Sequence, residues 1–190
     1  MVRNRAVFLD RDGVINEPII TDGKPGSPLL VSEIKICPGV SEGISKLREH
    51  GFELVIVSNQ PEVSRGNLSL KTLQAINLEI ASMTGIEYFY CCTHSDDDAC
   101  DCRKPLPGMI LSASTDLNLD IHSSFLIGDR WRDILAGLNA GCKTIWIDRG
   151  YREVMPENYT YRVVNFLAAV QLVCLDAKKA LVSDMRTSDN

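Results

Sequence analysis

The sequence predicts an α/β protein in which a Rossmann-like parallel sheet carries helices on both faces. Short aliphatic runs alternate with stretches of helical periodicity, the order typical of strands joined by crossover helices. The runs are almost uniformly apolar, as expected for strands that are buried on both faces. With 190 residues, the chain has the length of one ordinary domain. We therefore expect a single domain over residues 1–190, with its core at 5–150 and no large cap domain.

Five segments fit such strands because each is brief and rich in Val, Ile, Leu and Phe. In chain order they are residues 6–9, 52–57, 86–90, 124–127 and 143–147. Between them, apolar residues recur three or four positions apart beside Pro or Gly, which indicates helices with start and stop signals. These helical stretches cover residues 40–47, 73–83, 110–117 and 134–138.

Three other segments complete the chain. Residues 14–37 are rich in Gly and Pro and are expected to form a turn-rich flap beside the first strand, while residues 92–107 are polar and rich in Cys. Long loops of this kind in a compact domain are usually functional. From residue 165 to about 182 the apolar residues again follow a helical period, so we expect a C-terminal helix that packs on the domain or on a partner.

The composition excludes some classes of function. The chain is 24% charged with a formal net charge of -5, whereas a general nucleic-acid binder needs a basic surface. No stretch approaches the roughly 20 apolar residues of a membrane-spanning helix. The first residues lack the apolar core and cleavage site of a signal peptide. We therefore expect a cytoplasmic monomer or weak homo-oligomer that binds neither nucleic acid nor a membrane.

Polar residues follow three of the predicted strands. Asp10, Ser58 and Asp129 each come directly after an aliphatic run, and ligands of parallel sheets bind beyond the carboxyl ends of the strands. Asp12 lies two residues after Asp10, which places the two side chains on one side of an extended backbone, roughly 7 Å apart. That spacing suits one carboxylate that attacks phosphorus and another that reaches the leaving oxygen.

Such chemistry brings an anionic nucleophile to an anionic phosphate, so it requires a divalent cation and a fixed ammonium. Asp129 can complete a magnesium site, because this hard cation prefers oxygen ligands, and Lys104 can supply the ammonium. The alternative is that each Asp only forms a turn or caps a helix. An EF-hand is excluded, because Val14 occupies the third ligand position and the glycine comes at position four of the loop. The P-loop, dinucleotide, zinc-protease and serine-elbow motifs are all absent.

The segment 92–107 contains a complete ligand set for zinc. Cys92, His94, Cys100 and Cys102 offer three sulfurs and one nitrogen, and four protein ligands leave no position for water, so the site would be structural. Cys91 competes with Cys92 as the first ligand, and the alternative for the whole loop is a set of free thiols. A zinc clamp would hold the following Arg103 and Lys104 in place.

Four segments together resemble the motifs of haloacid dehalogenase superfamily phosphatases, in the order found in that family. They are Asp10-Arg11-Asp12-Gly13-Val14-Ile15-Asn16, Val57-Ser58-Asn59-Gln60, Cys102-Arg103-Lys104-Pro105, and Gly128-Asp129-Arg130 with Asp133. The added cysteine-histidine loop resembles the branch that contains heptose 1,7-bisphosphate phosphatases and histidinol-phosphate phosphatases. The resemblance covers residues 5–150 and departs from the pattern at residues 61–64, which intervene before Arg65.

The resemblance implies roles at the matching positions. Asp10 would be the nucleophile, Asp12 the general acid and then base, and Lys104 the group that stabilises charge. Mg²⁺ would be held by the Asp10 side chain, the Asp12 backbone carbonyl and Asp129, with Asp133 steadying that site. The expected substrate-binding residues are Ser58, Asn59, Gln60, Arg65, Arg103 and Lys104.

Three functions are consistent with these residues. The first is a magnesium-dependent phosphatase of a small sugar (bis)phosphate, such as D-glycero-D-manno-heptose 1,7-bisphosphate, whose product heptose 1-phosphate would feed lipopolysaccharide or capsule synthesis. The second is the same catalyst acting on histidinol phosphate, another small metabolite or a nucleic-acid 3′-phosphate end. The third is a non-catalytic, zinc-stabilised binding module, which would leave the aspartates at the strand ends unexplained.

Overall fold

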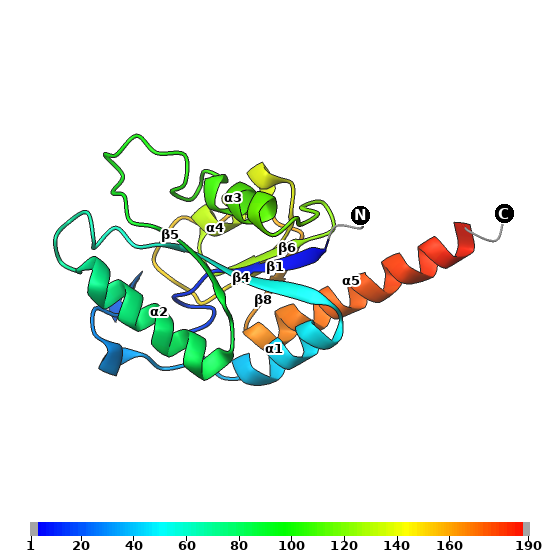
Figure 1. Ribbon diagram of the computed structural model, residues 1–190, viewed down its shortest axis with the longest axis horizontal. Helices are drawn as coiled ribbons and strands as arrows, with labels where there is room; N and C mark the ends of the chain where they lie inside the picture. The colour runs from blue at the N-terminus through cyan, green and yellow to red at the C-terminus, as the bar shows by residue number, and fades with distance from the viewer. Residues whose placement is uncertain (1–3, 188–190) are drawn as a thin grey trace.

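A single six-stranded sheet forms the centre of the molecule. The structure is a computed structural model that describes residues 4–187, with side chains of the last helix described as far as residue 179. All neighbouring strands run parallel, in the order β5-β4-β1-β6-β7-β8. Helices cover both faces of this sheet (Figure 1), so the predicted fold class is confirmed.

The five predicted strands are all present, with ends that differ from the predictions by at most two residues. The strands of the sheet are β1 (Arg5–Leu9), β4 (Phe52–Asn59), β5 (Tyr88–Cys92), β6 (Phe125–Gly128), β7 (Lys143–Ile147) and β8 (Tyr161–Val163). The edge strand β8 was not predicted, because it has only three residues and its side chains are partly exposed.

The helices form two layers that bury two separate clusters of apolar side chains. They are α1 (Val40–Glu49), α2 (Leu70–Thr84), α3 (Gly108–Asp116), α4 (Trp131–Ala140) and α5 (Phe166–Thr187). Helices α1, α2 and α5 cover one face, while α3 and α4 cover the other (Figure 1). Strand β1 supplies both clusters by alternation: Val7 and Leu9 face the first, and Ala6 and Phe8 face the second. The last helix continues past the predicted end near 182.

The segment 14–37 is more regular than the sequence indicated. It contains a hairpin of β2 (Ile19–Thr21) and β3 (Lys24–Gly26), followed by the short 3-10 helix η1 (Val31–Glu33). Part of this flap, Pro25 to Ser27, lines a cavity at the carboxyl end of the sheet. No larger insertion occurs within the described residues, as expected for a fold without a large cap domain.

The order of the strands determines where a ligand can bind. From β1 the chain moves outward through β4 and β5, then returns to the other side of β1 and continues through β6, β7 and β8. Leu9, the last residue of β1, pairs with Ile56 on one side and with Ile127 on the other, and β4 and β6 then continue to Asn59 and Gly128. The crevice at such a topological switch point is the usual binding site of parallel sheets. Among the described residues, no helix combines the length and the apolar character needed to cross a membrane.

Candidate active site

Three buried carboxylates meet at this switch point. Asp10 follows β1, Asp129 follows β6, and Asp133 lies in the first turn of α4. Each offers a carboxylate oxygen, and these oxygens all lie within 4.8 Å of one another. The three residues are only 6%, 2% and 3% exposed. The structure thus brings together side chains that are more than a hundred residues apart in the chain.

Two glycines allow this approach. A β-carbon on Gly13 would lie 1.7 Å from Asp129 Oδ2, and one on Gly128 would lie 2.2 Å from the β-carbon of Asp133. Gly13 also has a φ of 96°, a conformation that other residues rarely adopt. Any side chain at either position would therefore push the carboxylates apart.

Lys104 provides the positive charge at the centre of the site. Its Nζ lies 2.5 Å from Asp10 Oδ1, 2.6 Å from Asp133 Oδ1 and 2.8 Å from the carbonyl oxygen of Val57. The backbone of Lys104 is held by the amide of Asn59, which accepts from its N–H and donates to its carbonyl oxygen, both at 3.0 Å. Burial alone would lower the pKa of Lys104, but the adjacent carboxylates raise it, so the ammonium stays charged.

The carboxylates of this site outnumber the ammonium, and two of them are buried with raised pKa values. Burial, followed by repulsion from Asp133, raises the pKa of Asp10 to about 7, against the opposing attraction of Lys104. Burial and the charges of Asp10 and Asp133 raise the pKa of Asp129 well above its usual value. Asp129 Oδ2 accepts from Tyr151 Oη at 2.7 Å, but its buried Oδ1 has no hydrogen-bond partner among the described residues. An unpartnered oxygen within an anionic, all-oxygen donor set fits a hard divalent cation such as Mg²⁺.

Asp12 lies at the same edge in a dense set of hydrogen bonds. The fully buried Arg11 donates to both of its oxygens, at 3.1 and 3.0 Å. Further donors come from Asn16, Ser27 and Gln60, at 2.9, 2.8 and 2.8 Å. Burial of Asp12 would raise its pKa, but the charge of Arg11 and these hydrogen bonds together lower it. The arrangement therefore holds Asp12 as a carboxylate.

A cavity of about 50 Å³ connects these groups to the surface. Five of the predicted site residues line it together: Asp10, Asp12, Ser58, Asn59 and Lys104. Arg130 and Arg132, at the start of α4, line it as well. The sequence reasoning did not assign a role to either arginine, although Arg130 lies directly after Asp129.

Three residues predicted to contact substrate do not line this cavity. Gln60 is fully buried and donates to Asp12 and Ser58, so its contacts are with two other predicted site residues. Arg65 is exposed and pairs with Glu62, in the turn after β4. The guanidinium of Arg103 binds the carboxylate of Asp96 and the carbonyl oxygen of His94, which directs it into the cysteine-histidine loop.

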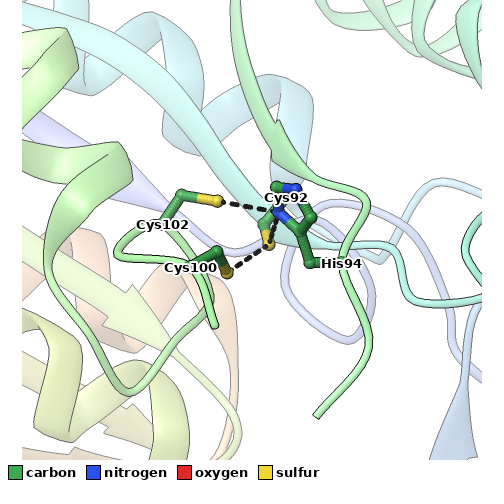
Figure 2. Close-up of side chains that lie close together, drawn as sticks. All are labelled: Cys92, His94, Cys100 and Cys102. Atoms are coloured by element: carbon green, nitrogen blue, oxygen red, sulfur yellow. Dashed lines mark hydrogen bonds between the residues drawn. The ribbon is translucent and has the colours of Figure 1, made fainter. Parts of the chain in front are cut away.

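The predicted zinc ligands converge at the end of β5 (Figure 2). Cys92 Sγ lies 3.9 Å from Cys100 Sγ and 3.5 Å from His94 Nδ1, which in turn lies 3.3 Å from Cys102 Sγ. Tetrahedral zinc with bonds of about 2.3 Å to sulfur requires ligand atoms about 3.5–3.8 Å apart. Cys91 is outside this group, and its sulfur accepts from Asn77. The four side chains therefore fit a zinc ion.

Several known proteins resemble this chain in sequence. The HAD-hydrolase-like family model matches residues 101–169. The D-glycero-beta-D-manno-heptose-1,7-bisphosphate 7-phosphatase of Helicobacter pylori is 32% identical over 149 residues, which cover 75% of this chain and 83% of that protein. The Vibrio cholerae protein of the same name is 36% identical over 152 residues, or 73% and 78% of the two chains.

A solved structure extends the similarity to the fold. The heptose 1,7-bisphosphate phosphatase of Bordetella bronchiseptica, crystallised with magnesium and phosphate, superimposes with a TM-score of 0.77. The two share 27% sequence identity, and the match covers 90% of this chain and 99% of the other. The chain belongs to the phosphatases of the haloacid dehalogenase-like hydrolase family.

Proposed function

We propose that the protein is a magnesium-dependent phosphomonoester hydrolase that converts D-glycero-β-D-manno-heptose 1,7-bisphosphate to heptose 1-phosphate. The observation that carries this proposal is the buried meeting of Asp10, Asp129 and Asp133 around Lys104, with Asp12 on the same cavity. The relatives that carry the name of this reaction support the choice of substrate.

Asp10 is the proposed nucleophile. One of its carboxylate oxygens attacks the phosphorus of the 7-phosphate, a bond to phosphorus forms, and the bond from phosphorus to the sugar oxygen breaks. The product of this step is an aspartyl phosphate. Lys104 holds Asp10 Oδ1 at 2.5 Å, which leaves the other oxygen to attack and brings positive charge to the phosphoryl oxygens.

Asp12 is the proposed acid and base. It gives a proton to the leaving sugar oxygen, then removes one from the water that attacks the aspartyl phosphate and releases Asp10. The hydrogen bonds around Asp12 and the charge of Arg11 favour its carboxylate form, which suits the second step. Donation to the sugar requires a protonated Asp12, and therefore a rearrangement of the hydrogen bonds from Arg11 and Ser27.

The two metal sites have different proposed purposes. Mg²⁺, held by the side chains of Asp10 and Asp129 and by the backbone carbonyl of Asp12, would neutralise the negative charge shared by nucleophile and phosphate. Zn²⁺, held by Cys92, His94, Cys100 and Cys102, would fix the loop that ends in Lys104. Asp133 steadies Lys104 through its own ion pair.

A comparison of substrates tests this proposal. We expect kcat/KM for the heptose 1,7-bisphosphate to exceed that for histidinol phosphate by about 100-fold, because only the former offers a second phosphate for charge-assisted contacts. Removal of Mg²⁺ from the buffer should abolish both activities. A higher kcat/KM for histidinol phosphate would contradict the proposed substrate, and full activity without any divalent cation would contradict the proposed site.

A further inference from the structure

A second, more open cleft lies directly beside the catalytic cavity. It has a volume of about 580 Å³, and its walls carry Lys24, Arg130, Arg132 and Arg152 with a single carboxylate, Glu153. Arg130 and Arg132 line both this cleft and the catalytic cavity, so the two spaces adjoin. A chain with a net charge of -5 thus gathers four cations beside its catalytic carboxylates.

Two of these cations have no counter-charge. Arg130 is held by Glu153 through two hydrogen bonds, and Arg132 Nη1 lies 2.7 Å from Asp96 Oδ1. Among the described side chains, neither Lys24 nor Arg152 forms an ion pair, and both are exposed. Two like charges on the same wall of the cleft repel and destabilise each other. Packing of the fold therefore does not require two unpaired cations there.

Local structure keeps these two cations on one wall. Lys24 lies on β3 of the flap hairpin, and Arg152 follows β7. The N–H of Arg152 donates to the carbonyl oxygen of Gly23 at 3.1 Å, and a β-carbon on Gly23 would lie 3.1 Å from Arg152 Cδ. The stem of Arg152 therefore packs on the turn of the hairpin, directly beside Lys24.

We propose that this cationic cleft binds the second phosphate of a bisphosphate substrate, and that Lys24 and Arg152 determine specificity for it. The inference rests on the proposed function. The catalytic cavity, about 50 Å³, is too small for a whole sugar bisphosphate, so the part of the substrate beyond the reacting phosphate must extend outward. The cleft adjoins that cavity, and its free charges match a phosphate.

The test compares two substrates that share the reacting 7-phosphate. The ratio of kcat/KM for heptose 1,7-bisphosphate to that for heptose 7-phosphate is measured in the wild type and in the double variant Lys24→Gln/Arg152→Gln. We expect the ratio to fall by at least about tenfold, through KM, because the variant loses two charged contacts that only the bisphosphate can make. The double variant Lys71→Gln/Lys178→Gln removes the same charge from exposed positions on α2 and α5 and should keep the wild-type ratio.

An unchanged ratio in Lys24→Gln/Arg152→Gln, or an equal fall in the control, would overturn the proposal. If the wild type releases phosphate from neither sugar, the proposed function fails instead. In that case the cleft is tested by calorimetry, which measures the affinity of each sugar for two proteins. One carries Asp10→Asn alone, and the other carries Asp10→Asn together with Lys24→Gln/Arg152→Gln. Tighter binding of the bisphosphate that is lost in the combined variant supports the cleft, and equal affinity for the two sugars overturns it.

Discussion

Asp10 and Asp129 are buried with too little positive charge around them, which makes the stability of the metal-free protein depend on pH. Burial and neighbouring carboxylates raise both pKa values, that of Asp10 to about 7. Between about pH 4 and pH 7 the folded protein therefore binds more protons than the unfolded chain. The free energy of unfolding must then fall as the pH rises through this window.

The prediction is that, in magnesium-free buffer, the protein melts at a higher temperature at pH 5 than at pH 8. Each unit of raised pKa corresponds to roughly 1.4 kcal/mol, enough to change Tm by several degrees. Added Mg²⁺ should raise Tm more at pH 8 than at pH 5, because the carboxylates that bind it are ionised at pH 8. Thermal denaturation at both pH values, with and without Mg²⁺, measures these effects.

Two variants make this measurement specific. Asp129→Asn should reduce both the loss of stability with pH and the stabilisation by Mg²⁺. Glu79→Gln removes one exposed charge from α2 and should leave both at the wild-type level. The interpretation is wrong if Asp129→Asn responds to pH and Mg²⁺ as the wild type does.

Single residues also show how far the site could be predicted. Asp10, Ser58 and Asp129 were predicted because each directly follows an aliphatic run, and such runs can be recognised in the sequence. The hydrogen-bond donors to Asp12 and the contact of Tyr151 with Asp129 could not be predicted from the sequence, because they depend on how distant loops pack together. Arg11 is fully buried, whereas an arginine beside two aspartates normally indicates an exposed turn.

At the scale of elements, we expect the loop between β5 and α3 to depend on a bound metal for its order. Few of its side chains are buried, and its polar residues cannot form a core. The zinc cluster begins at Cys92, the last residue of β5, while Asn59 of β4 holds the backbone of Lys104 at the other end. Zinc is therefore expected to position Lys104 against Asp10.

We predict that Cys100→Ser loses zinc and that its kcat/KM falls by about 10- to 100-fold, because a displacement of about 1 Å at Lys104 has effects of this size. Elemental analysis should show less zinc in Cys100→Ser than in the wild type. Proteolysis within residues 92–107 should be faster in this variant, in parallel with its loss of activity. Cys91→Ser is the matched control and should retain zinc, since the Cys91 sulfur accepts from Asn77 instead. Loss of zinc in Cys91→Ser, or its retention in Cys100→Ser, would refute the ligand assignment.

Elements differed in how well the sequence predicted them. The buried strands and the helices were predicted correctly, because uninterrupted apolar runs and helical periods can be recognised in the sequence itself. The hairpin β2–β3 was missed, since each strand has three residues, mostly exposed, and Pro25 interrupts the pattern. That hairpin matters for function, because it carries Lys24 and Ser27 to the edge of the cavity.

At the scale of the whole molecule, the order of the strands places the proposed reacting groups and the proposed substrate-binding groups at the same edge of the sheet. The carboxyl ends of three parallel strands lie side by side at the switch point, where Asp10 and Asp129 meet and Ser58 lines the catalytic cavity. Loops from the flap and from the region after β7 surround that point and provide the cationic cleft. The sheet thus positions the reacting groups, while the loops provide the groups proposed to select the substrate.

The central claim is that Asp10 forms a bond to phosphorus during turnover. The most direct test is to quench the reaction of heptose 1,7-bisphosphate with acid and to examine the peptide that contains Asp10 by mass spectrometry. The account predicts a phosphoryl adduct on Asp10 of the wild type, removed by hydroxylamine, and neither adduct nor phosphate release in folded Asp10→Asn. Phosphate release at the wild-type rate by Asp10→Asn would contradict it.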